Sequence, residues 1–264
     1  PELRIIMSVE FEKQGRVAVV TINRPQSMNA IDLNTHLAFQ EIWPRINQDD
    51  EIHVVVLTGA GNKAFCSGAD IGTFLPYLRE RALKEVDDGD FCGINRGSPT
   101  TKPIIAAING LAYAGGLEIA LACDLRIAVD YAKFALPEPR WGVIAGAGGV
   151  TRLSRVIPTA LATQMVLTGE PISAERALAE GLVSELTTSE NLLPRAMEIA
   201  DSITKNGPLA VRASLQVIRR GADCGLDAAL ELERTAFRRI LLSEDFKEGI
   251  AAFTEKREPA YKGQ

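Results

Sequence analysis

Short apolar runs that alternate with helical segments restrict the fold of this chain more than any other feature. Ile104–Ile108, Leu125–Val129 and residues 54–57 are mostly aliphatic, which is typical of strands buried on both faces. Residues 134–135 repeat the pattern more briefly. Because helical segments lie between these runs, the first half of the chain predicts an α/β fold with a largely parallel sheet.

Two further strands are predicted near the start of the chain, at residues 9–11 and at Val17–Ile22. Asp32 is the predicted N-cap of a helix, in which Pro44 should cause a kink or begin a new turn. Residues 75–98 are charged and weakly periodic, which predicts a mobile helix and loop lying over another part of the protein.

After Ser189 the pattern becomes almost entirely helical. Apolar residues recur three or four positions apart in residues 194–203, 208–218, 226–240 and 244–253. We therefore expect an α/β core that carries the active site in residues 1–190 and a helical C-terminal region in residues 191–264.

Composition excludes several classes of protein. The 264 residues contain no apolar run of the length, about 18 residues, that a membrane-spanning helix needs. A net charge of −5, with lysine and arginine spread along the chain, offers no basic surface for nucleic acid. The start of the chain resembles neither a signal peptide nor a transit peptide, so a cytoplasmic location is expected.

Several catalytic motifs are missing from the sequence. It contains no GxSxG, HExxH or Walker A pattern, and the four cysteines are scattered without a CxxC pair. His36 and His53 neighbour no nucleophile or metal ligand, and residues 146–149 are interpreted as a glycine-rich helix start. We therefore expect neither a metal ion nor a bound prosthetic group.

Two glycine-containing turns follow predicted strands, at residues 65–70 and 109–116. The second turn runs directly into a helix, whose first N–H groups have no partner within the helix. If the two strands are neighbours, each turn can direct one N–H at a single carbonyl oxygen, which is the arrangement of an oxyanion hole. Either turn alone is also explained as an ordinary tight turn.

Two glutamates are the candidate acid–base groups. Glu118 lies in an otherwise apolar helix start, where a carboxylate is costly unless it is paired or functional. Glu138 lies between Pro137 and Pro139 and is explained equally well as a loop acid. Two carboxylates that share a dry site cannot both ionise easily, so one becomes an acid and the other a base.

These residues occur in an order that resembles the crotonase superfamily, which contains the enoyl-CoA hydratase/isomerase family. The resemblance rests on Ala64-Phe65-Cys66-Ser67-Gly68-Ala69-Asp70, Ile105 to Glu118, Cys123-Asp124, Pro137-Glu138 and Gly146-Ala147-Gly148-Gly149. It extends from Arg24-Pro25 and Asn29-Ala30 to residues 253–257, and thus covers nearly the whole chain. The two glutamates are twenty residues apart, as expected for the hydratases.

The resemblance implies a spiral of ββα turns followed by C-terminal helices that assemble three chains into a trimer, or six into a hexamer. It implies that the amides of Ala69 and Gly115 hold a thioester oxygen. Glu118 and Glu138 would then add water across the α,β double bond of an enoyl-CoA. Coenzyme A enters as part of the acyl-CoA substrate, and its implied contacts are Arg24, Asn29, Ala30, Cys66, Ser67, Gly68, Asp70, Ile71, Phe253 and Lys256.

The sequence departs from the family pattern at two positions. Ala114 stands where a third glycine is expected, so the turn should have a backbone that alanine tolerates. Trp141 is bulkier than expected after the second glutamate and is interpreted as packing near the acyl pocket.

Three alternative functions remain open. An enoyl-CoA isomerase would use the same oxyanion hole with essentially one carboxylate, so two glutamates favour a hydratase. The superfamily also contains hydrolases, dehalogenases and decarboxylases, and the choice of substrate is expected to lie in residues 75–98. A non-catalytic RNA-binding or scaffold protein would require a clustered basic surface, which the sequence lacks.

Overall fold

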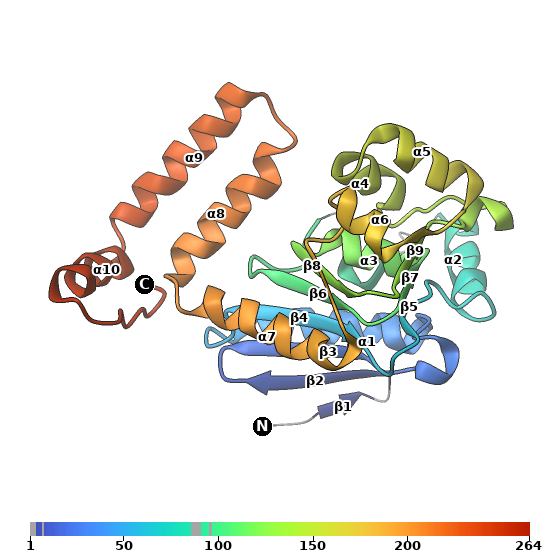
Figure 1. The fold of residues 1–264 in the computed structure, drawn as a ribbon, viewed down its shortest axis with the longest axis horizontal. Coiled ribbons are helices and arrows are strands. Elements are labelled where there is room, and N and C mark those ends of the chain that lie inside the picture. The colour runs from blue at the N-terminus through green and yellow to red at the C-terminus, as the bar shows by residue number, and fades with distance from the viewer. Residues whose placement is uncertain (1–3, 7, 86–90, 95–96) are drawn as a thin grey trace.

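The computed structural model describes residues 4–6, 8–85, 91–94 and 97–264 (Figure 1). Within these residues the strands form two sheets. The larger sheet contains, in spatial order, β1 (Arg4–Ile6), β2 (Val9–Gln14), β3 (Val17–Ile22), β4 (Val54–Gly59), β6 (Ile104–Ile108), β8 (Leu125–Val129) and β11 (Glu185–Thr187). The smaller sheet contains β10 (Ile172–Ser173), β9 (Lys133–Ala135), β7 (Leu111–Tyr113) and β5 (Ala64–Cys66).

From β4 to β9, consecutive strands alternate between the two sheets, and this alternation produces the spiral. β4, β6 and β8 each enter the larger sheet, and β5, β7 and β9 follow them into the smaller one. Each pair leads into helical structure before the next pair begins. From β3 onward the larger sheet is parallel, as are β5, β7 and β9. The predicted α/β fold of ββα turns is therefore confirmed.

The apolar runs form the centre of the larger sheet. Every residue of β4 and β6 is buried, so these strands have no solvated face. Such burial explains why the two segments are continuous apolar runs instead of alternating patterns. The predicted bounds of β3, β6 and β8 agree with the structure.

Helices cover both faces of the larger sheet. The helical segments of the first two-thirds of the chain are η1 (Pro25–Ser27), α1 (Leu33–Gln48), α2 (Phe74–Leu83), η2 (Phe91–Gly93), α3 (Gly115–Ala122), η3 (Glu138–Trp141), α4 (Gly149–Val156), α5 (Thr159–Thr168) and α6 (Ala174–Ala179). Asp32 caps α1 by accepting a hydrogen bond from the Thr35 amide at 2.8 Å, as predicted. The helix continues through Pro44 as one element.

Residues 75–98 are only partly described. They contain most of α2 and all of η2, whereas residues 86–90 and 95–96 lie outside the described residues. The prediction of a helix and loop is therefore confirmed for the helix, and its mobility stays a prediction.

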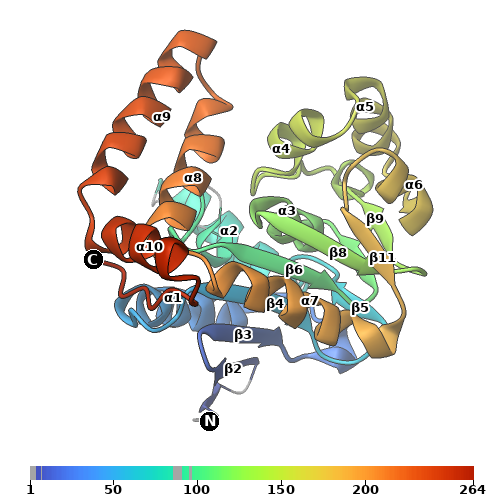
Figure 2. The same cartoon turned by 60° about the vertical axis from the view of Figure 1, so that its left-hand side comes forward.

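The C-terminal region consists of α7 (Ser189–Thr204), α8 (Pro208–Gly221), α9 (Leu226–Leu241) and α10 (Glu244–Glu255). α7 buries Leu192, Ala196 and Ala200 and packs across β3, β4, β6 and β8. α8 and α9 form a hairpin that stands away from the sheets (Figures 1 and 2). By packing, α7 therefore belongs with the core, and the separate helical region begins at α8.

Two further findings concern only the described parts of the chain. None of their helices combines the length and the apolar character that crossing a membrane requires. No group of three or more His, Cys, Asp or Glu side chains there is placed to hold a metal ion.

Candidate active site

The two glycine-containing turns meet at one edge of the smaller sheet. β5 and β7 run parallel as neighbours, so the turns that follow Cys66 and Tyr113 lie side by side. A Cβ atom placed on Gly68 would lie 2.6 Å from the Cβ of Ala114 and 3.0 Å from the amide nitrogen of Gly115. The backbones of the two turns are therefore in close contact.

The amides of Ala69 and Gly115 border this contact. Ile31 bridges the first turn by donating its N–H to the Gly68 carbonyl and accepting from the Asp70 amide, both at 2.8 Å. The N–H of Ala69 therefore faces away from Ile31. Gly115 begins α3, so its N–H has no partner within the helix. Among the described residues neither amide donates a backbone hydrogen bond, which leaves both N–H groups for a ligand oxygen.

The backbone at Ala114 differs from the expectation. It has φ +50° and ψ −129°, whereas the sequence predicted a turn that alanine tolerates. Such a conformation costs an alanine of order 1–3 kcal/mol. Two hydrogen bonds hold it: the Ala114 amide donates to the Ala135 carbonyl at 2.9 Å, and the Ala114 carbonyl accepts from the Glu118 amide at 3.1 Å. The turn is therefore strained and fixed by its neighbours.

Glu118 lies in the first turn of α3 with 4% of its surface exposed. Its Oε1 accepts hydrogen bonds from the amides of Ala147, at 2.7 Å, and Gly149, at 2.8 Å. Burial raises the pKa of Glu118, although these two amides and the charge of Arg152 act to lower it. The carboxylate is therefore desolvated but held on one side by two donors.

The loop that holds Glu118 was interpreted from sequence only as a helix start. It does start α4, and Gly148 has φ +98° as the N-cap of that helix. The loop also binds the Glu118 carboxylate, which requires glycine at position 149, because a Cβ there would lie 2.9 Å from Oε1 of Glu118. The glycines that marked a turn therefore also leave room for a carboxylate.

Glu138 follows β9, the neighbour of β7 in the smaller sheet, so both glutamates lie beyond adjacent strand ends. Glu138 is 8% exposed, and its Oε2 is buried without a hydrogen-bond partner among the described residues. Burial raises its pKa to about 7, its own backbone amide lowers it, and the charge of Glu118 raises it further. The structure thus brings together Ala69, Gly115, Glu118 and Glu138.

Phe91 of η2 lies over the turn that leads into α3, a contact that the sequence did not reveal. A Cβ on Gly115 would lie 2.8 Å from the Phe91 ring. The backbone of Cys92 is fixed by α1, because its amide donates to Nδ1 of His36 at 3.1 Å and its carbonyl accepts from the Trp43 indole at 2.7 Å. Phe91 is therefore a fixed wall of the site.

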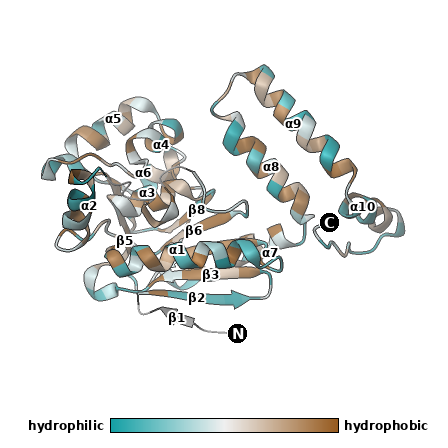
Figure 3. Ribbon diagram, turned by 180° about the vertical axis from the view of Figure 1, so that it is seen from behind, coloured by the Kyte–Doolittle hydropathy of each residue, from teal (hydrophilic) through white to brown (hydrophobic). Residues whose placement is uncertain are grey.

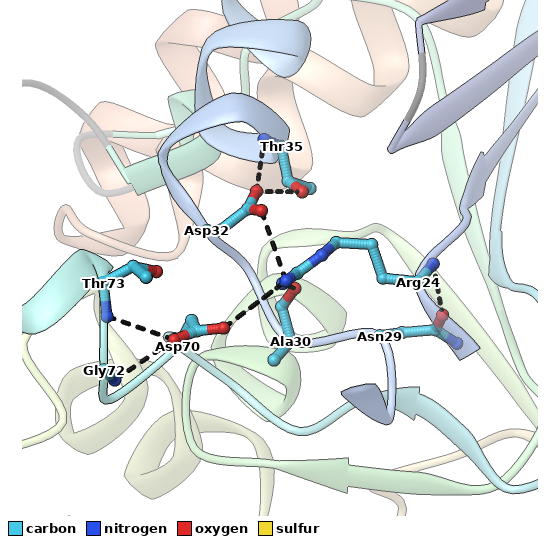
Figure 4. Close-up of polar contacts among 8 residues, drawn as sticks. All are labelled: Arg24, Asn29, Ala30, Asp32, Thr35, Asp70, Gly72 and Thr73. Atoms are coloured by element: carbon cyan, nitrogen blue, oxygen red, sulfur yellow. Dashed lines mark hydrogen bonds and ion pairs between the residues drawn. The ribbon is translucent and has the colours of Figure 1, made fainter. Parts of the chain in front are cut away.

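Several of the expected coenzyme A contacts form one polar network (Figure 4). The Arg24 guanidinium donates to the Ala30 carbonyl at 2.5 Å and lies 3.3 Å from Asp32 and 3.5 Å from Asp70. The other carboxylate oxygen of Asp70 accepts from the amides of Gly72 and Thr73, just before α2, at 3.1 Å each. The network joins η1, α1 and the turn after β5, so it fixes the position of that turn.

The side chains of Asn29 and Cys66 are buried and do not line an open binding path. Asn29 is completely buried, and its side chain donates to the carbonyls of Ala60 and Ala64 at 3.0 and 2.7 Å. Cys66 is also completely buried, and its Sγ accepts from the Gly68 amide at 3.3 Å. Both side chains therefore support the turn from behind instead of facing a ligand. Ser67 is half-buried, and its amide donates to the Met28 carbonyl at 3.1 Å.

Three more of the expected coenzyme A contacts, Ile71, Phe253 and Lys256, are exposed, and Ile71 lies far from the other two within one chain. Ile71, beside the turn after β5, is 61% exposed, and Phe253 of α10 is 85% exposed. Lys256 ends α10 with φ +54°. α10 and β5 lie at opposite ends of the molecule (Figures 1 and 3). Phe253 and Lys256 therefore cannot reach the Arg24 network of the same chain in this conformation.

Trp141 was expected to pack near the acyl pocket. It is 68% exposed at the end of η3, and the following Val143 and Ile144 are exposed as well. The expected packing is therefore absent from the single chain, and an apolar loop next to Glu138 is open to solvent.

Comparison with known proteins agrees with this geometry. A family model described as enoyl-CoA hydratase/isomerase matches residues 12–264. The chain is 44% identical over 257 residues to (E)-benzylidenesuccinyl-CoA hydratase from Thauera aromatica, covering 97% of this chain and all of the relative. It is 42% identical to the short-chain-enoyl-CoA hydratase of Clostridium acetobutylicum, with 95% of each chain covered.

Solved structures resemble the chain over almost its full length. An enoyl-CoA hydratase from Mycobacterium marinum has a TM-score of 0.89 at 38% identity, covering 97% of this chain and 99% of that one. An enoyl-CoA hydratase from Bacillus anthracis has a TM-score of 0.88 at 36% identity, covering 98% and 100%. Together with the family match, these findings show that the chain belongs to the enoyl-CoA hydratase/isomerase family.

Proposed function

We propose that this protein is an enoyl-CoA hydratase, which adds water across the α,β double bond of an enoyl-CoA to give a 3-hydroxyacyl-CoA. The observation that carries the proposal is the pair of buried carboxylates beyond adjacent strands, beside two amides whose N–H groups donate no backbone hydrogen bond to the described residues. The hydratase names of several relatives agree with it.

The thioester oxygen is placed at the amides of Ala69 and Gly115. Negative charge develops on this oxygen when hydroxide adds to the β-carbon, and two fixed donors stabilise it by roughly 3 kcal/mol each. Because backbone N–H groups supply the stabilisation, the identity of the side chain at position 69 is of little importance to this step.

The two glutamates supply the elements of water. Glu118, held by two amides, is the carboxylate that orients the water and accepts its proton as hydroxide adds to the β-carbon. Glu138, whose pKa is raised to about 7 by burial, is the acid that donates a proton to the α-carbon. The product gains OH on one carbon and H on the other, and the proton left on Glu118 returns Glu138 to its starting state through solvent.

Coenzyme A binding is proposed along the turn after β5. The Arg24 network fixes this turn, and the exposed Ile71 borders it. Phe253 and Lys256 are proposed to reach the coenzyme A of a neighbouring chain, since their own chain places them at the far end. Acetoacetyl-CoA, an enolisable product mimic, should bind with a Kd of micromolar order, about −8 kcal/mol.

Assembly into a trimer or a hexamer is proposed through the helical region that begins at α8. Among the described residues α9 has no buried side chain, although it carries Leu226, Leu230 and Phe237. Exposed apolar surface of this kind is uncommon on monomers. The expected cytoplasmic location stays a prediction.

The carboxylates also provide the test of the reaction. Glu118→Gln and Glu138→Gln should each lower hydration of crotonyl-CoA by about 10²- to 10⁴-fold, because a catalytic proton transfer is lost. The double variant should be little worse than the worse single variant, since the two groups act as one unit. Loss of the conjugated enoyl absorbance measures the rate, and Glu198→Gln, an exposed residue of α7, is the control.

The same experiment distinguishes a hydratase from an isomerase. Conversion of a 3-enoyl-CoA is measured in parallel, and an isomerase would need only one carboxylate. Near-wild-type hydration by Glu118→Gln would contradict the mechanism proposed here. A wild-type protein that isomerises but does not hydrate would be an isomerase, and one that binds no acyl-CoA would favour a non-catalytic role.

A further inference from the structure

Arg152 lies one helical turn beyond the loop that holds Glu118. Its Nη1 donates to the Ala147 carbonyl at 2.9 Å, and its Nη2 donates to the Ile94 carbonyl at 2.5 Å. A Cβ atom on Gly148 would lie 2.1 Å from Nη1. The guanidinium therefore rests directly against the backbone of this loop, which has space for it only because position 148 is glycine.

The peptide groups around Ala147 are held from both sides. The Ala147 amide donates to Glu118, and the Ala147 carbonyl accepts from Arg152. The Gly149 amide is the second donor to Glu118, and the Arg152 amide donates to the Gly148 carbonyl at 2.8 Å. A shift of the guanidinium would therefore move both donors that hold the carboxylate.

The second contact of Arg152 reaches the other side of the site. Ile94 directly follows η2, the segment whose Phe91 ring lies against Gly115. Arg152 thus joins the loop that holds the Glu118 carboxylate to the segment that covers the turn before α3. These two parts of the chain are 58 residues apart in sequence at the Arg152–Ile94 hydrogen bond.

We propose that Arg152 is a positioning residue of the active site, which fixes the two amides that donate to Glu118. The proposal deepens the hydratase function and rests on it. Arg152 is not assigned any contact with the substrate, because its guanidinium is occupied by two carbonyls of the chain.

The charges around Glu118 agree with this role. Burial is the main cause that raises the pKa of Glu118, and the amides of Gly149 and Ala147 oppose it, followed by the charge of Arg152. Glu138 is the other charged group that faces Glu118. Among the described residues, Arg152 is the cation whose charge acts on Glu118. Its removal should therefore raise the pKa of Glu118 further.

Two substitutions separate geometry from charge. Arg152→Gln removes both the guanidinium hydrogen bonds and the positive charge. The kcat for crotonyl-CoA hydration should then fall about 10²-fold, as expected for small displacements of catalytic groups. KM should change much less. The acidic limb of the kcat/KM–pH profile should move to higher pH, because an opposite charge has been lost. Arg152→Lys keeps the charge, so its acidic limb should stay near the wild-type position while kcat falls.

Arg155→Gln is the matched control, because Arg155 lies on the same helix and is exposed, and its partners among the described residues, the Thr151 carbonyl at 2.9 Å and Asp223 at 3.8 Å, lie outside the loop that holds Glu118. The thermal midpoint of each variant is measured beside its kinetics. If Arg152→Gln is too unstable to assay, Arg152→Lys still tests the geometry. The proposal would be overturned if Arg152→Gln kept the wild-type kcat and pH profile. It would also be overturned if Arg152→Lys kept the wild-type kcat.

A readout without turnover separates this inference from the proposed function. The carboxyl band of Glu118 is followed with pH by infrared difference spectroscopy and assigned by its loss in Glu118→Gln. Its titration should move to higher pH in Arg152→Gln and not in Arg155→Gln. An unchanged titration would refute the role of Arg152 even in a hydratase, whereas a shifted titration in a protein without hydratase activity would refute only the proposed reaction.

Discussion

At Gly68 two constraints on the backbone coincide. Its φ of +102° is a conformation that residues with a side chain rarely adopt, and a Cβ there would lie 2.6 Å from that of Ala114. Both constraints arise because the turn after β5 touches the turn before α3. The position of the two amides that are proposed to bind the thioester oxygen therefore depends on the absence of a Cβ atom at Gly68.

Gly68→Ala should consequently separate the two turns. Hydration of crotonyl-CoA should fall by about 10²-fold or more, the loss typical of one misplaced oxyanion donor. The matched control is Gly15→Ala, because Gly15 also has a positive φ, +58°, but nothing lies within 4 Å of its added Cβ. Comparable activity in the two variants would show that the contact between the turns is unimportant for catalysis.

The ionisation of Glu138 should be visible in stability as well as in activity. Burial raises its pKa from 4.5 to about 7 in the folded protein. The stability linked to this group is therefore fully present below about pH 4.5 and is lost as pH rises through about 7, since the folded state binds its proton more tightly.

Relative to Glu138→Gln, the wild-type free energy of unfolding should thus decrease between pH 4.5 and 7, by about 1–3 kcal/mol. Urea unfolding at several pH values measures the difference, and Glu198→Gln, an exposed residue, should follow the wild type. Parallel curves for the wild type and Glu138→Gln would mean that Glu138 titrates normally in the folded protein.

At the scale of elements, the Arg219–Asp124 ion pair attaches the projecting hairpin to the core. The Arg219 guanidinium of α8 makes two hydrogen bonds to Asp124, at 2.8 and 2.7 Å, and a third to the Thr100 carbonyl at 2.7 Å. Asp124 also accepts from the amide of Ile104, the first residue of β6. The Asp124 carboxylate, which binds the first amide of β6, therefore also positions α8.

Arg219→Ala should loosen this attachment and leave Asp124 unpaired. The side chain of Asp124 is only 12% exposed, and removal of one partner of such a pair costs about 2–4 kcal/mol. Arg234→Ala, which breaks an exposed pair with Glu231 on α9, should cost less than about 1 kcal/mol. Calorimetric thermal midpoints of both variants decide the matter, and equal shifts would show that the Arg219 pair is no more important than a surface contact.

At the scale of the whole molecule, the hairpin of α8 and α9 is the part with the least burial. A groove of about 430 Å³ runs between the two helices and is lined by Ala210, Ala213, Ser214, Val217, Ile218, Glu233, Ala236, Phe237 and Ile240. Figure 3 shows this hairpin apart from the sheets, with hydrophobic positions along both helices. The shape agrees with helices that are completed by another chain.

Light scattering should therefore give a mass three or six times 28.5 kDa. Phe237→Asp, which places a charge at a 62% exposed apolar position, should lower the mass to that of a monomer. Glu231→Gln, on the same helix, should leave the mass unchanged. A wild-type monomer at micromolar concentration would contradict the proposed assembly.

Much of the fold was predictable because its signals are local. The strands of the larger sheet are buried on both faces, so their sequences are continuous apolar runs. Asp32 caps the next helix from three residues away, which a sequence pattern can express. The order of the short motifs was also sufficient to predict the family, which the comparisons confirm.

The structure alone decided how the site is held. The donors to Glu118 are about 30 residues away in sequence, the contact between Arg152 and Ile94 spans 58 residues, and nothing in those segments marks the partner. Asn29 and Cys66 were expected among the coenzyme A contacts, and the structure buries both side chains completely, because burial depends on what packs over a residue. The sequence by itself therefore determined the central strands of the larger sheet, the C-terminal helices, the family and the two candidate carboxylates. The tertiary structure decided the backbone of Ala114, the wall formed by Phe91 and the donors to Glu118, because each depends on contacts between distant parts of the chain.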